Sequence, residues 1–164
     1  GVITGLGGYA GHSHKYQQKG GSGYLFRTAT VQDFSAVTGA CLLVRASVYD
    51  EVGGLDEQFA VAFNDVDFCL RVRDAGYRIA WTPYAQLVHY ESKSRGGDEK
   101  DPAKAARFAA EQQRLYAIHG KEDILDDPYY NPNLTRDRED FSESDDLRRL
   151  KEGTVTVRFR GGEA

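Results

Sequence analysis

The stretch Phe63-Asn64-Asp65-Val66-Asp67-Phe68-Cys69-Leu70-Arg71 predicts the start of a helix with two carboxylates in its first turn. We expect Asn64 to cap this helix, which runs over residues 65–75, and Gly76 to end it. Acidic side chains at its beginning and basic ones in its last half suit the helix dipole. The helix therefore presents its two carboxylates at one end.

Two interpretations of this carboxylate pair stay open on the pattern alone. Asp65 and Asp67 do not share a helix face, but at a helix start one can point into a cleft while the other caps backbone N–H groups. A fixed carboxylate of this kind can act as a general base, although the pattern alone favours plain capping. A carboxylate-pair hydrolase would need a second acid about 5–10 Å away, for which Glu57 and Glu91 are the candidates nearby in sequence.

The segments around this helix predict an α/β fold. Strands are expected at residues 1–4, 35–44, 77–81 and 85–90, with a last one at 154–159. A short helix is expected at 45–52, closed by Gly53 and Gly54, and a longer one from Asp101 and Pro102 to about residue 118. The Gly-rich opening up to residue 35 predicts loop apart from its first strand.

Composition excludes some classes of protein. The chain has 164 residues, which suggests one domain, and a net charge of −4, which argues against binding to a nucleic-acid backbone. No uncharged run approaches the ~20 apolar residues of a transmembrane helix. Cys41 and Cys69 lie in apolar segments, so we expect two buried, unpaired thiols and a reducing, cytoplasmic compartment.

A second polar group follows a predicted strand end. His89 is followed by Glu91, Ser92, Lys93, Ser94 and Arg95. Imidazole binds transition metals and Arg binds phosphate oxygens, so this segment could hold a metal ion and a diphosphate together. A polar surface loop with a hydrogen-bonded His explains the same residues equally well.

Three other features allow simpler explanations. In Thr38-Gly39-Ala40, a glycine interrupts a predicted strand, which marks either a close ligand approach or a packing contact beneath Trp81 or Tyr84. His12 and His14 are expected in a mobile loop rather than at a metal. The aromatic and Pro-containing segment 126–134 is expected to dock against the domain.

Together these segments resemble the C-terminal half of a family 2 glycosyltransferase with the GT-A fold. The motifs that carry the resemblance are, in order, Val37-Thr38-Gly39-Ala40-Cys41-Leu42-Leu43-Val44-Arg45, Val52-Gly53-Gly54-Leu55-Asp56-Glu57, the stretch 63–71 quoted above, Ala75-Gly76-Tyr77-Arg78, Thr82-Pro83-Tyr84-Ala85 and His89-Tyr90-Glu91-Ser92. The Gly-rich opening at residues 5–12 and the segment 127–134 also resemble this family, so the resemblance covers roughly residues 1–135. Within the family, the chain is similar to bacterial polysaccharide and rhamnosyl-type transferases. The resemblance implies a mixed sheet flanked by helices.

The resemblance implies a role for each matching residue. Asp65 would be the catalytic base, with Asp67 acting beside it at the catalytic helix start and Arg71 supporting substrate binding there. Where many members have Glu before the base, this chain has Asn64. Metal binding would fall to His89. The remaining substrate contacts would come from Thr38, Gly39 and Ala40 under the donor sugar and acceptor, and from Ser92, Ser94 and Arg95 near the diphosphate.

The same resemblance implies an inverting, Mg²⁺- or Mn²⁺-dependent enzyme of cell-surface polysaccharide synthesis. It would move a sugar from a nucleotide-diphosphate donor to a glycan or lipid-linked acceptor, in the cytoplasm or at the inner face of the membrane. The nucleotide-binding half and its metal motif are not seen, so residues 1–135 are expected to be the acceptor side of a catalytic domain, inactive alone. Residues 136–164 are expected to form a charged, partly flexible tail. An exposed sheet edge could pair two copies into a homodimer, and a non-catalytic glycan-binding module is the alternative function.

Overall fold

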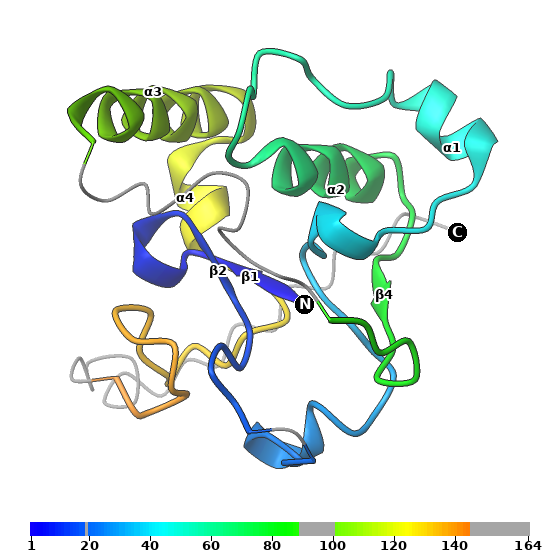
Figure 1. Ribbon diagram of the computed structural model, residues 1–164, viewed down its shortest axis with the longest axis vertical. Helices are drawn as coiled ribbons and strands as arrows, with labels where there is room; N and C mark the ends of the chain where they lie inside the picture. The colour runs from blue at the N-terminus through cyan, green and yellow to red at the C-terminus, as the bar shows by residue number, and fades with distance from the viewer. Residues whose placement is uncertain (19, 89–100, 145–164) are drawn as a thin grey trace.

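The computed structural model describes residues 1–18, 20–88 and 101–144, which contain four helices and two small sheets, with the helices gathered on one side of the strands in the view of Figure 1. Strands β1 (Val2–Thr4) and β2 (Ala10–His12) pair antiparallel, with Ile3 opposite Gly11. Strands β3 (Gln32–Asp33) and β4 (Ala80–Trp81) form the second antiparallel pair. In these residues the α/β character is thus present, but as two two-stranded sheets rather than the mixed sheet that we expected.

Three of the four helices begin and end close to the positions that the sequence predicted, and the last lies in a segment for which no helix was predicted. The four helices are α1 (Ala46–Glu51), α2 (Asn64–Asp74), α3 (Pro102–His119) and α4 (Lys121–Leu125). The Asp101 carboxylate caps α3 by accepting a hydrogen bond from the Ala103 N–H at 2.9 Å. Gly76 follows α2 with a φ of 89°, a left-handed conformation that glycine adopts without strain. Three 3₁₀ turns, η1 (Leu6–Gly8), η2 (Tyr24–Phe26) and η3 (Gly39–Cys41), complete the elements.

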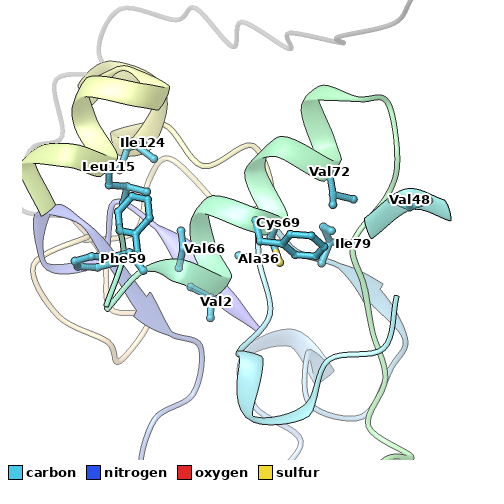
Figure 2. Close-up of a cluster of buried hydrophobic side chains, with 12 residues drawn as sticks. Val2, Ala36, Val48, Phe59, Val66, Cys69, Val72, Ile79, Leu115 and Ile124 are labelled. Carbon is cyan, nitrogen blue, oxygen red and sulfur yellow. The ribbon is translucent and has the colours of Figure 1, made fainter. Parts of the chain in front are cut away.

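Helix α2 lies at the centre of the main hydrophobic cluster (Figure 2). The helix contributes Val66, Phe68, Cys69 and Val72 to this cluster. The other buried members come from β1, α1, α3, α4 and the segments between them, and include Val2, Ala36, Val48, Phe59, Ile79, Leu115 and Ile124. This burial fixes α2 on several sides, so the position of its N-terminus is set by the core.

The helix start differs in detail from our prediction. Phe63, with a φ of 64°, is the cap residue, and no side chain caps the helix there. Asn64 is the first helical residue, and its side-chain oxygen accepts a hydrogen bond from the Asp65 N–H at 2.8 Å. The prediction of Asn64 as the cap was therefore wrong by one residue.

Two predicted strands are absent from the described residues. In 35–44 only Ala36 forms a bridge, to Val2, after which the chain turns into η3 because the Thr38 hydroxyl accepts a hydrogen bond from the Ala40 N–H. Leu43 is 99% exposed, so this apolar run is not a buried strand. Residues 85–88 form no strand either, and β4 covers only the end of the predicted 77–81.

A second cluster joins the two ends of the described chain. Ile3, Leu6 and Phe34 pack with Tyr130 and Leu134. The buried Asp127 carboxylate accepts hydrogen bonds from the N–H (2.7 Å) and the hydroxyl of Thr4 (3.2 Å). The predicted docking of 126–134 is confirmed. The strand predicted at 154–159 lies outside the described residues.

None of the helices in the described ranges has the length and apolar character needed to cross a membrane.

Candidate functional site

The candidate site is centred on Asp65 in the first turn of α2. Its Oδ2 accepts a hydrogen bond from the Gly39 N–H at 2.7 Å, and its Oδ1 accepts one from the Val66 N–H at 2.9 Å. The side chain is half-buried, so it is held in place and still reaches solvent. A carboxylate can accept about four hydrogen bonds, which leaves acceptor sites on both oxygens.

The glycine at position 39 allows this contact. A Cβ at Gly39 would lie 3.3 Å from the Asp65 Cβ and 3.6 Å from its Oδ2. The close neighbour is therefore the candidate base itself and not Trp81 or Tyr84, which we had considered as packing partners. Thr38 is half-buried and Ala40 is exposed beside it, so the predicted group 38–40 does lie next to Asp65.

Asp67, two residues further on, has a different environment. It is 1% exposed, and its Oδ2 accepts hydrogen bonds from Arg71 Nη2 (2.7 Å) and Nε (3.0 Å). Its Oδ1 lies 2.8 Å from His119 Nε2. Burial favours a higher pKa for Asp67, but the hydrogen bonds from His119 and Arg71 outweigh it and hold the pKa below its usual value. Both of its oxygens thus have partners inside the protein, and the catalytic role expected of Asp67 stays a prediction.

Arg71 likewise makes its contacts within the protein, with 25% of its side chain exposed. Besides Asp67, its guanidinium donates to the Val52 carbonyl through Nη1 at 2.5 Å. It pairs with Asp67 and not with Asp65. Arg71 thus ties α2 to the residue that follows α1, and its predicted substrate contact stays a prediction.

Sequence reasoning missed the contribution of α3. His119 lies 52 residues after Asp67, and Glu111 and Arg114 of the same helix contact residues 56, 61 and 62. A signal was present, since these three polar residues recur around Leu115 at helical spacing.

The chain matches a family model described as glycosyl transferase family group 2 over residues 10–116. This chain belongs to that glycosyltransferase family. It is 48% identical over 86% of its length to an uncharacterized Sinorhizobium fredii protein, y4gI, of which the match covers 15%. It is 35% identical over 82% of its length to the Myxococcus xanthus O-antigen biosynthesis protein RfbC, covering 10% of that protein.

A third relative is the N-acetylglucosaminyl-diphospho-decaprenol L-rhamnosyltransferase of Mycobacterium tuberculosis, 36% identical over 49% of this chain and 24% of that enzyme. The glycosyltransferase chain thus spans between about a tenth and a quarter of the length of these relatives. No solved structure gives a significant match.

The described part of the glycosyltransferase chain does not form a metal site by itself. It contains no group of three or more His, Cys, Asp or Glu side chains suitably placed around a common point. The Asp67 oxygens are already used, and the predicted ligand His89 lies outside the described residues, as do Ser92, Ser94 and Arg95.

Two smaller predictions need correction. His14 is not in a free loop, because its ring lies 2.6 Å from the Ser13 hydroxyl, accepts from the Tyr24 N–H at 3.0 Å and stacks on Phe141. Burial and the nearby Arg27 charge lower the pKa of His14 to about 4. Both cysteines are unpaired as expected, but only Cys69 is buried, whereas Cys41 is exposed.

Proposed function

We propose that this chain forms the acceptor side of an inverting glycosyltransferase of cell-surface polysaccharide synthesis. The donor would be a nucleotide-diphosphate sugar and the acceptor a hydroxyl of a glycan or lipid-linked saccharide. Family membership and the similarity to two relatives, an O-antigen biosynthesis protein and a rhamnosyltransferase, support this assignment.

In the proposed reaction, Asp65 removes the proton from the acceptor hydroxyl. The acceptor oxygen attacks the anomeric carbon from the side opposite the leaving group. The bond from that carbon to the nucleoside diphosphate breaks, and its electron pair leaves with the phosphate oxygen. General-base catalysis of this kind contributes typically 10²–10⁴-fold to a rate.

The observation that carries the proposal is the contrast between the two carboxylates. The Asp65 carboxylate is fixed by the Gly39 N–H and is half-buried, whereas Asp67 is buried and fully engaged. A general base needs a held carboxylate with free acceptor sites that a substrate hydroxyl can reach. Asp65 meets these requirements.

A requirement for Mg²⁺ or Mn²⁺ is part of the proposal through the family resemblance. Its ligands would come from outside the described residues, with His89 as one candidate, and the metal would offset the charge on the departing diphosphate.

The test is Asp65→Asn in the full-length protein, assayed for sugar transfer with a panel of UDP- and dTDP-linked sugars. We expect transfer to fall by about 10²-fold or more while donor binding persists, because the amide cannot take the acceptor proton. Asp74→Asn is the matched control, since it makes the same change at an exposed position of α2. Near-normal turnover in Asp65→Asn would overturn the assignment, and glycan binding without transfer in the wild type would favour the binding-module alternative.

A further inference from the structure

One side of α3 carries polar residues that reach the segment leading into α2. We name residues 56–63 the lead-in segment, since they connect the Gly53-Gly54 turn to the helix that bears Asp65. Leu115 of α3 is fully buried and lies with Phe59 of the lead-in segment and Ile124 of α4 near one end of α2 (Figure 2). Figure 1 shows the end of α3 beside the chain that descends into α2. The polar contacts surround this apolar centre.

The first contact is made by Glu111, which is 5% exposed. Its two carboxylate oxygens accept hydrogen bonds from the N–H groups of Val61 (3.2 Å) and Ala62 (2.7 Å). These N–H groups directly precede Phe63, whose left-handed backbone starts α2. Both residues are half-buried, and backbone donors shielded from water need such partners, so Glu111 holds the turn in shape.

The second contact is made by Arg114. Its Nη2 donates to the Asp56 carboxylate at 2.6 Å, and its guanidinium lies 5.4 Å from the centre of the Phe59 ring. This ion pair is partly exposed and contributes modestly to stability. It fixes the far end of the lead-in segment on α3.

The third contact joins the end of α3 to the first turn of α2. His119 is almost buried, with 7% of its side chain exposed, and its Nε2 lies 2.8 Å from Asp67 Oδ1. The lowered pKa of Asp67 keeps that carboxylate ionised at neutral pH, so the imidazole Nε2 carries the proton and donates it to the hydrogen bond.

We infer that His119 is a positioning residue for Asp65, acting through Asp67 and together with Glu111. Asp65 lies between two anchored points, the turn at Val61 and Ala62 and the carboxylate of Asp67. Releasing either point allows the first turn of α2 to shift against Gly39. A displacement of about 1 Å at a reacting group can cost 10²-fold in rate, so these two contacts together set the geometry of proton transfer to Asp65. The inference rests on the proposed function of Asp65.

The test compares His119→Ala and His119→Gln in the full-length protein. We expect His119→Ala to lower kcat by about tenfold or more with the donor KM within about twofold, because proton-transfer geometry changes and donor binding does not. His119→Gln offers an amide N–H donor and should recover part of that loss. Gln113→Ala, at an exposed position of the same helix, is the matched control and should behave as the wild type.

A second measurement separates positioning from the proposed chemistry. Hydrogen exchange followed by mass spectrometry should show faster exchange at residues 61–67 in His119→Ala, with unchanged exchange in α1. If Asp65→Asn retains turnover, the proposed function fails, yet this exchange result still decides whether His119 orders the segment. If His119→Ala does not fold, kcat and hydrogen exchange at residues 61–67 are compared in His119→Gln and Glu111→Gln instead. Wild-type kcat together with wild-type exchange in a folded variant would overturn the inference.

Discussion

Asp67→Asn should destabilise the fold strongly, because Asp67 binds both Arg71 of its own helix and His119 of α3. Its carboxylate receives three short polar contacts at 2.7, 2.8 and 3.0 Å while being 1% exposed. Removing one partner of a buried ion pair costs about 3–5 kcal/mol. Asparagine keeps one oxygen that can accept from either neighbour, while its amide hydrogens face the other donor. We therefore expect the free energy of unfolding to fall by about 3 kcal/mol, near the lower end of that range.

Thermal unfolding measures this loss directly. At this chain length each kcal/mol lowers Tm by about 2–4 °C, so Asp67→Asn should unfold about 6–12 °C below the wild type at pH 7. Asp74→Asn removes the same charge at an exposed position of α2 and should change the stability by no more than about 0.5 kcal/mol.

The pH dependence provides an independent check. The folded-state pKa of Asp67 lies below that of the unfolded chain. The ionised carboxylate therefore stabilises the fold above about pH 4, and this stabilisation is lost as the pH falls through the folded-state pKa. The difference in Tm between the wild type and Asp67→Asn should therefore narrow on acidification below about pH 4. Equal melting of Asp67→Asn and Asp74→Asn at pH 7 would refute the reasoning, as would a difference that is constant down to pH 2.

Two further experiments test the contact between Gly39 and Asp65 and the place where the nucleotide binds. Gly39→Ala keeps the N–H that binds Asp65 but places a Cβ 3.3 Å from the Asp65 Cβ. It should lower transfer by about tenfold to 10²-fold with little change in Tm, and wild-type transfer would show that this contact does not orient the base. The isolated chain should bind UDP or dTDP only weakly in the presence of Mn²⁺ when measured by calorimetry. Tight binding would contradict the proposal that the nucleotide is held mainly outside this chain.

Three of the four helix positions were predictable because their signals are local. Gly53, Gly76 and the pair Asp101-Pro102 lie at or next to helix ends, and each acts through its own backbone conformation or a neighbouring N–H group. Such features need no knowledge of distant residues.

The segment 35–44 could not be predicted in the same way. A short apolar run has no period that separates a buried strand from an irregular segment, and strand formation depends on a partner elsewhere in the chain. Here the available partner is Val2, which pairs only with Ala36 before Thr38 turns the chain. The exposure of Leu43 follows from that turn.

The candidate site was only half predictable. The sequence correctly placed Asp65 at a helix start, but its contact with Gly39 spans 26 residues and depends on how η3 packs against α2. The ties of Asp67 to His119 and of Glu111 to the lead-in segment span about 50 residues and come from α3. Local patterns do not specify which helix will supply such partners.

The spacing of the two carboxylates explains why they differ. Residues two apart on an α-helix are separated by about 200° around its axis, so Asp65 and Asp67 point to nearly opposite sides. When Asp65 faces Gly39 and solvent, Asp67 must face the packed side, where its charge requires Arg71 and His119. Asp67 cannot then serve as the second acid of a carboxylate-pair hydrolase, because both of its oxygens are occupied. Because Asp67 faces the packed side, its contacts with Arg71 and His119 fix the helix turn that carries Asp65.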